Sequence, residues 1–130
     1  MKKILLTIII CLFFSGVSYS ENYPAYVTNI VDGDTIDVTL DLGFGVSLSD
    51  RVRLLDYDAP ETYRPGSPQE KALGEKAKEF IKEKILGKGI VLGVPKKERG
   101  KYGRILGVVY LRGENINELM KEMGFVKEDR

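Results

Sequence analysis

The sequence predicts an α+β fold that is mainly β, with five short strands and two helices in one domain. Its 130 residues can supply a single domain with one modest core. Apolar and polar residues alternate in several segments, as in strands with one buried face, and apolar residues recur at helical spacing in two others. Glycine and proline separate these segments at short intervals, as expected for brief elements joined by turns.

The first three predicted strands form a meander. Residues 25–30 lead into a tight turn at Asp32-Gly-Asp-Thr35, and residues 36–40 then alternate apolar and polar side chains, the pattern of a half-buried strand. Residues 41–50 include two glycines and are predicted to be a long hairpin loop. The third strand begins at Arg51 and ends before a proline, which has no N–H and forces the preceding residue to be extended.

One predicted helix follows the third strand and the other follows the fifth. Ser67-Pro-Gln-Glu70 is a capping box with proline at the first helical position. Apolar residues then recur at helical spacing until Gly87 ends the helix. The second helix is short, is capped by Asn115 or Asn117, and ends at Gly124.

The fourth and fifth strands are predicted at residues 90–94 and 104–110, with a basic loop between them. The complete order is three strands, a helix, two strands and a helix. This order suits a five-stranded Greek-key barrel of the OB-fold type with two helices. The loops and strand faces of such barrels commonly bind oligonucleotides.

The first twenty residues are predicted to be a signal peptide, which leaves residues 21–130 as the domain. Lys2 and Lys3 form a short basic region, residues 4–14 are an almost unbroken apolar run, and small residues precede the expected cleavage after Ser20. The run is shorter than the ~20 residues that cross a bilayer, so an uncleaved anchor is the less favoured alternative. We therefore expect a secreted or periplasmic monomer with no stable membrane association.

Charge and missing residue types restrict the possible chemistry. Removing Lys2 and Lys3 from 20 basic and 19 acidic residues leaves 18 against 19, a net charge near −1. Affinity for a polyanion must then come from local clusters. The chain has no histidine and its one cysteine, Cys11, lies in the leader, which excludes His-dependent triads, His metal sites and thiolate nucleophiles. An enzyme of this composition would use carboxylates, arginine, lysine, tyrosine and a hard metal.

Carboxylates gather at two turns beside the predicted strands. Asp58 and Glu61 follow the third strand at a bend fixed by Pro60, and with Arg53 they supply a hard oxygen ligand, a possible base and a phosphate-binding fork. Asp34, before the second strand, adds an oxygen ligand from a separate strand end, an arrangement that Ca²⁺ or Mg²⁺ favours. The alternative is an ordinary Arg–carboxylate ion pair beside a common Asp-Gly turn.

A second basic cluster spans residues 96–104 and interleaves Tyr102 with Lys101 and Arg104. Such a cluster can clamp a phosphate and stack a base or sugar on the tyrosine. Arg104 stands at the mouth of an otherwise apolar strand, where a half-buried guanidinium needs an anionic partner. For the cations at positions 96, 97 and 99, the alternative is a solvated hairpin tip.

Three motifs in this order resemble those of the thermonuclease family, the staphylococcal nuclease-like proteins. They are Asp32-Gly-Asp-Thr35, then Arg53 with Asp58-Ala-Pro-Glu61, then Lys101-Tyr-Gly-Arg104. The resemblance covers nearly the whole of residues 21–130. It implies a Ca²⁺-dependent nuclease on an OB-fold, which hydrolyses phosphodiester bonds in DNA and RNA.

The resemblance also implies roles for individual residues. By motif position, Ca²⁺ would be bound by the side chains of Asp34 and Asp58 and by the backbone carbonyl of Ala59, where family members often have threonine. The implied catalytic residues are Arg53, Glu61 and Arg104. Lys101 and Tyr102 would contact the substrate.

The chemistry of these residue types agrees with the implied reaction. Water that attacks a phosphodiester builds negative charge on the phosphate oxygens, which a metal and two arginines stabilise without histidine. Glu61 would act as a general base or as a water-positioning carboxylate. Two other classes stay open, namely a non-catalytic OB-fold module that binds nucleic acid and an exported domain that binds Ca²⁺ only for stability.

Overall fold

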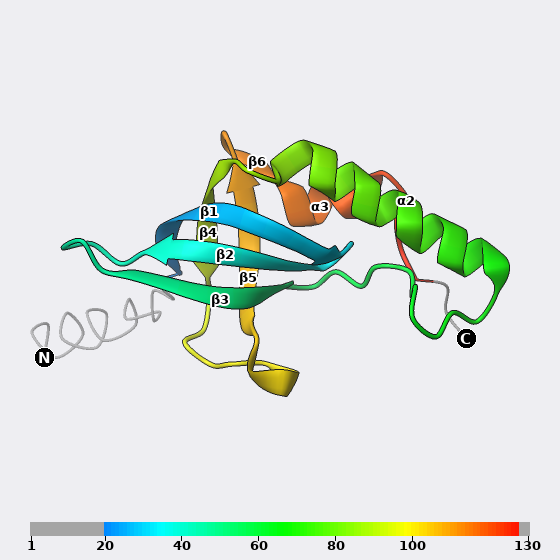
Figure 1. Ribbon diagram of the computed structural model, residues 1–130, viewed down its shortest axis with the longest axis horizontal. Helices are drawn as coiled ribbons and strands as arrows, with labels where there is room; N and C mark the ends of the chain where they lie inside the picture. The colour runs from blue at the N-terminus through cyan, green and yellow to red at the C-terminus, as the bar shows by residue number, and fades with distance from the viewer. Residues whose placement is uncertain (1–19, 128–130) are drawn as a thin grey trace, which may run out of the picture.

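The computed structural model describes residues 20–127, which form a closed five-stranded barrel with helices against one side (Figure 1). β1 (Glu21–Asp32), β2 (Thr35–Asp41) and β3 (Ser47–Leu54) are an antiparallel meander. β4 (Gly89–Val94) pairs with β1, and β5 (Ile105–Leu111) pairs with β4. Parallel pairing of β5 with β3 closes the barrel, so the predicted α+β OB-fold barrel is confirmed. The predicted signal peptide lies, apart from Ser20, outside the described residues.

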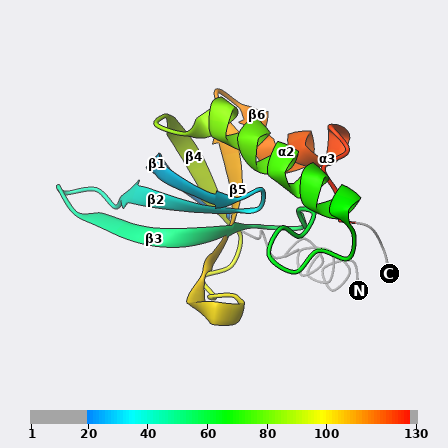
Figure 2. The same ribbon diagram turned by 45° about the vertical axis from the view of Figure 1, so that its right-hand side comes forward.

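The helices occupy the predicted places in the chain. α2 (Pro68–Ile85) follows β3, the 3₁₀ turn η2 (Lys101–Gly103) precedes β5, and the two-residue strand β6 (Glu114–Asn115) leads into α3 (Ile116–Glu122). In Figures 1 and 2 the two α-helices lie next to each other, and the yellow loop that contains η2 projects from a different side of the barrel. No helix among residues 20–127 is both long enough and apolar enough to span a membrane.

The core fills the barrel and the space under the two helices. Alternate positions of the strands are fully buried, as the period-two pattern predicts, and they include Val27, Ile36, Val38, Val52, Leu54 and Leu92. α2 adds Ala77, Ile81 and Ile85, and α3 adds Ile116 and Met120. The buried cluster of the described residues runs from Ala25 to Met120. The closed barrel and both helices thus share one core within residues 20–127.

α2 packs closely against the segments that follow β1 and β3, and two glycines permit this approach. A Cβ added at Gly74 of α2 would lie 2.6 Å from the carbonyl oxygen of Pro60, and one added at Gly33 would lie 2.9 Å from the Cβ of Ala59 and 3.0 Å from the Cβ of Ala77 on α2. The distances of 2.6 and 2.9 Å are too short for a real side chain. The sequence alone does not show this contact, because the residues concerned are far apart along the chain.

One local prediction needs correction, and one alternative that the sequence left open is decided. The predicted hairpin loop at residues 41–50 is shorter, because the β2–β3 ladder continues through Asp41 paired with Ser47. Serines and an aspartate on the outer face of the ladder look like loop residues in the sequence, although their backbone is paired. For the second helix the N-cap is Asn115, whose side chain accepts a hydrogen bond from Glu118 N at 3.0 Å. Asn117 is buried instead.

Candidate functional site

The turn between β1 and β2 lies beside the end of β3. Thr35 pairs with Arg53 in the β2–β3 ladder, and the N–H of Leu54 donates to the carbonyl oxygen of Asp34 at 2.8 Å. Strand pairing thus brings the Arg53 guanidinium to the Asp34 carboxylate, with Nη1 and Oδ2 2.7 Å apart. Two of the sequence motifs meet at this point.

Arg53 is held on both sides of its guanidinium. Nη1 also donates to the carbonyl oxygen of Tyr57 at 2.8 Å, and Nη2 donates to the Asp58 carboxylate. The Arg53 side chain is only 18% exposed. Asp34 and Asp58, the two carboxylates implied as metal ligands, therefore contact one arginine. The ion pair that the sequence left as an alternative is present, in the same place as the predicted phosphate fork.

A polar cavity of about 210 Å³ opens beside this arginine. It contains five of the eight predicted site residues, together with polar neighbours from the turn before β2 and the loop after β3. Its lining is Asp32, Asp34, Thr35, Arg53, Ala59, Pro60, Glu61, Thr62 and Arg104. Arg104 reaches the cavity from the neighbouring strand, because it directly precedes β5 and β5 pairs in parallel with β3. A cavity with these side chains suits a small anionic group or a hydrated ion.

Three predicted residues lie outside the cavity lining. The Asp58 side chain is 75% exposed and lines a neighbouring pocket with Arg53 and Tyr57. Lys101 and Tyr102 lie on η2, and the Tyr102 ring is 82% exposed. The ammonium of Lys101 and the guanidinium carbon of Arg104 lie 5.3 and 5.5 Å from the centre of that ring. The tyrosine is thus an exposed platform next to the cavity, within range of two cations.

The left-handed backbone of Tyr102 is unusual for a side chain of this kind. Its φ is 65°, a conformation that residues other than glycine rarely adopt. Gly103 follows with a φ of 74°, which glycine adopts without cost. Strained backbone tends to occur at functional positions, so this geometry agrees with a binding role for the tyrosine.

Negative charge is concentrated at Asp34. Burial and, next, the neighbouring Asp32 raise the pKa of Asp34 to about 6, against the opposing influence of Arg53 and the N–H of Ala59. Asp34 accepts a hydrogen bond from that N–H at 2.8 Å. A divalent cation bound here would relieve the burial and repulsion of the two carboxylates.

The donors at the cavity are oxygens. Its lining includes the carboxylate residues Asp32, Asp34 and Glu61 and the hydroxyl residues Thr35 and Thr62. Within residues 20–127, no three His, Cys, Asp or Glu side chains are grouped as a metal site. Oxygen donors with an excess of negative charge fit a hard cation such as Ca²⁺ that retains several waters.

Glu70, a residue that the sequence assigned only to the helix cap, fastens the loop that carries Glu61. Its side chain is buried, and its two carboxylate oxygens accept hydrogen bonds from Glu61 N at 3.3 Å and Gly66 N at 2.9 Å. Its own N–H donates to the Ser67 side chain at 3.1 Å, as the capping box predicts. Glu70 therefore joins the start of α2 to both ends of the 61–66 loop.

Replacing Glu70 with glutamine should lower the free energy of unfolding by about 1–3 kcal/mol, because one acceptor becomes a donor and a loop N–H loses its partner. Urea denaturation of both proteins measures this difference. Glu75→Gln, on the exposed side of the same helix, is the matched control. If the two variants are equally stable, Glu70 does not hold the loop.

Apart from Pro60, three residues of the cavity lining were not predicted as site residues. Asp32 shares the Asp-Gly-Asp turn with Asp34, and Thr35 follows it, so the motif itself was the available signal. Thr62 has no signal in the sequence beyond its position next to Glu61. These residues line the cavity because the turn at Gly33 and the bend at Glu61 both face it.

The segment after α3 closes over the loop that carries Asp58. The Tyr57 hydroxyl donates to the carbonyl oxygen of Phe125 at 2.6 Å, and Lys127 N donates to the carbonyl oxygen of Asp58 at 3.2 Å. The Phe125 ring lies 5.3 Å from that of Phe80 on α2. Burial, and then the negative charge of Asp34, raises the pKa of Tyr57, so its hydroxyl stays a donor. The chain beyond α3 thus supports the back of the site.

Comparison with known proteins assigns the chain to a family. Residues 51–128, more than half of the chain, match the family described as "Staphylococcal nuclease homologue". The thermonuclease of Staphylococcus hyicus is 30% identical over 113 residues, which cover 87% of this chain and 63% of that protein. The thermonuclease of Staphylococcus intermedius is 32% identical, with coverage of 78% and 56%. A Haemophilus influenzae protein named as an uncharacterized endonuclease is 34% identical, with coverage of 95% and 62%.

The chain spans less than two thirds of the length of these relatives. With the closed OB-fold barrel and five of the eight predicted site residues at one cavity, this match shows that the chain belongs to the staphylococcal nuclease family.

Proposed function

We propose that the protein is an exported, Ca²⁺-dependent nuclease that hydrolyses phosphodiester bonds in DNA and RNA. The observation that carries this proposal is that Arg53, Arg104 and Glu61 line one cavity with Asp34. The names of the relatives, thermonuclease and endonuclease, support the same activity. Export rests on the predicted signal peptide, and we propose that the protein acts as a monomer.

In the proposed reaction the two arginines bind the scissile phosphate. Arg53 at the end of β3 and Arg104 before β5 reach the cavity from neighbouring strands. Arginine remains protonated and offers a planar set of donors, so it binds phosphate oxygens in two-point fashion. Charge that develops on these oxygens in the transition state is therefore met by donors already in place.

Glu61 is the carboxylate proposed to act on the attacking water. It would accept a proton from this water or orient it toward phosphorus. Its own Oε1 accepts a hydrogen bond from Tyr63 N at 3.0 Å, and its backbone is held by Glu70. These contacts fix the start of the loop without occupying both oxygens of the Glu61 carboxylate.

The proposed Ca²⁺ would be held by Asp34, Asp58 and the Ala59 carbonyl, with Asp32 nearby. When bound, Ca²⁺ supplies positive charge to the phosphate and lowers the pKa of bound water. Arg53 now pairs with both Asp34 and Asp58. When substrate binds, Arg53 must give up at least one contact with these carboxylates so that its guanidinium can bind the phosphate.

Digestion of single-stranded DNA and RNA by the protein spanning residues 21–130, with Ca²⁺, Mg²⁺ or EGTA, tests the proposal. Cleavage is expected with Ca²⁺ and is expected to stop with EGTA. Glu61→Gln should lower the cleavage rate by about 10²–10⁴-fold, whereas Glu75→Gln on the exposed side of α2 should cleave like the wild type.

Two results would replace the proposal. Binding of nucleic acid without cleavage under all conditions would identify a non-catalytic binding module. A melting temperature that falls with EGTA, with neither cleavage nor a further shift on adding nucleic acid, would identify Ca²⁺ as purely structural.

A further inference from the structure

A second, larger groove runs from the cavity along the outer face of the β1–β3 meander. Its volume is about 510 Å³, and its walls include Arg51 and Ser49 of β3, Asp37 of β2, and Tyr102 of η2. Arg104 lines both the groove and the cavity. A nucleic-acid strand with one phosphate at Arg104 can therefore continue directly into the groove.

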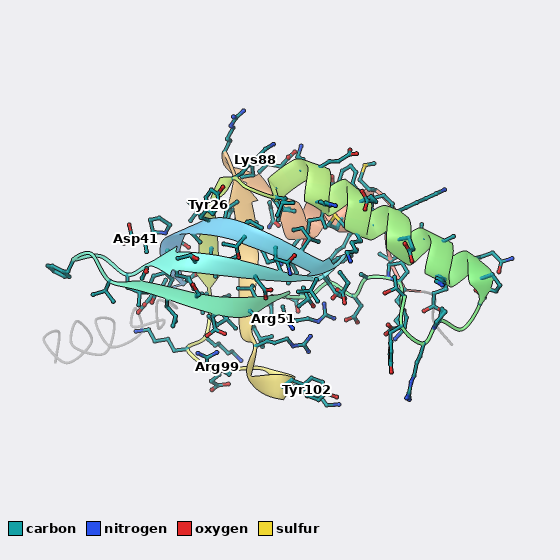
Figure 3. All side chains as sticks on the ribbon, viewed as in Figure 1. Tyr26, Asp41, Arg51, Lys88, Arg99 and Tyr102 are labelled. Atoms are coloured by element: carbon teal, nitrogen blue, oxygen red, sulfur yellow. The ribbon has the colours of Figure 1, made fainter. Side chains whose placement is uncertain are left out.

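Arg51 and Arg104 come together at the start of this groove. The parallel pairing of β3 with β5 begins at Val52 opposite Ile105, and Arg51 and Arg104 are the residues just before this pair. Figure 3 shows Arg51, Arg99 and Tyr102 on the same side of the molecule, with Lys88 at the opposite side. Asp37 already pairs with the Arg51 guanidinium, so a phosphate at these strand ends would be bound by Arg104 and by the remaining N–H groups of Arg51.

The spacing of the arginines along β3 suits consecutive phosphates. Arg51 and Arg53 point to the same face of the strand and are two positions apart, which places their Cα atoms about 6.7 Å from each other. Val52 between them is fully buried in the core, which fixes the direction of both side chains. This separation is comparable with that of neighbouring phosphates in an extended single strand.

Arg51 is held in position but keeps donors for a ligand. Nε donates to Asp37 Oδ1 at 2.7 Å and Nη2 to Asp37 Oδ2 at 3.2 Å, while the Arg51 side chain is half exposed. Asn29 donates to the same carboxylate at 3.2 Å. The guanidinium has five N–H groups, so the remaining ones face solvent. An arginine that is already oriented loses less side-chain freedom when it binds phosphate.

The two carboxylates of the groove do not prevent phosphate binding. Asp37 pairs with Arg51, and Asp50 pairs with Arg99 at 2.7 Å. The charges of these four side chains cancel, which leaves Arg104 and Lys101 as the positive charges beside Tyr102. The groove is thus suited to one phosphate and its nucleotide, in agreement with the near-neutral charge of residues 21–130.

We propose that this groove binds the nucleotide next to the scissile phosphate. Arg51, oriented by Asp37, donates to the adjacent phosphate, and the nucleotide between the two phosphates packs against Tyr102. The inference rests on the proposed nuclease function and extends it to a second phosphate subsite. The ligand is a single-stranded nucleic acid with at least two consecutive phosphates.

Cleavage of short substrates tests the subsite. A dinucleotide with a single phosphodiester is compared with the same dinucleotide carrying one further phosphate at its 5′ or its 3′ end. In the wild type, the phosphate at one of the two ends should raise kcat/KM. Arg51→Gln should lower kcat/KM for that phosphorylated substrate about tenfold. Arg51→Gln should cleave the unmodified dinucleotide like the wild type, and Lys88→Gln, the control across the molecule, should match the wild type on all substrates.

The salt dependence of binding is a second readout that a purely structural role would not change. In a Glu61→Gln background, with single-stranded DNA and Ca²⁺, the slope of log K against log salt should become shallower by about 0.7 when Arg51 is replaced by glutamine. Arg51→Lys, which retains the charge, should keep the slope and lose part of the affinity.

The outcomes separate the subsite from the nuclease proposal. If the wild type cleaves all three substrates and Arg51→Gln affects them equally, or the slope is unchanged, the subsite is wrong and the nuclease function stands. If the wild type cleaves none of the three, the nuclease proposal fails. The slope then still tests Arg51, because it measures binding alone.

Discussion

Replacing Arg53 with lysine is expected to lower the rate of phosphodiester cleavage about 1,000-fold. The Arg53 guanidinium contacts the Asp34 carboxylate, the Tyr57 carbonyl and the Asp58 carboxylate. The ammonium of a lysine is not planar and cannot reproduce all three contacts. Lysine keeps the charge but loses two-point binding of the phosphate. Since the interaction strengthens in the transition state, kcat should fall more than KM changes.

Steady-state kinetics on single-stranded DNA, with thermal melting of each variant, measures this effect. Arg112→Lys is the matched control, because Arg112 is an exposed arginine in the turn between β5 and β6. Its cleavage rate should equal that of the wild type. Cleavage by a folded Arg53→Lys variant within tenfold of the wild-type rate would show that Arg53 does not bind the reacting phosphate.

Replacing Asn117 with alanine should lower the free energy of unfolding by about 3 kcal/mol. The Asn117 side chain accepts a hydrogen bond from Val109 N and donates to the carbonyl oxygens of Leu55 and Gly107, each at 3.0 Å. Only 2% of the residue is exposed. Alanine would leave buried backbone groups of β5 and of the segment after β3 without these partners.

Urea denaturation at a constant m-value measures the loss. Asn115→Ala is the control, because Asn115 caps the same helix from an outer position and its loss should cost about 1 kcal/mol. Asn117→Asp should be intermediate, since it keeps an acceptor for Val109 N and loses the donor. Equal stability of Asn117→Ala and Asn115→Ala would rule out the bridging role.

The sequence was most informative where structure is local. The capping box at Ser67 predicted the first residue of α2, and the alternation around Val52 predicted the buried face of β3. The motif residues named as the site were largely brought to one cavity. The hairpin between β2 and β3 was misjudged, because strand residues on an exposed face have the same polar composition as a loop.

The sequence by itself determined the order of the elements, their buried faces and the restriction to carboxylate and arginine chemistry. These follow from periodicity over a few residues and from residue types that are present or absent. Only the tertiary structure decided that Asp58 lies outside the cavity, that Glu70 holds the Glu61 loop, and that Asn117 joins α3 to β5. A buried polar side chain is satisfied by whichever backbone groups the fold brings to it, and these come from segments far away in the chain.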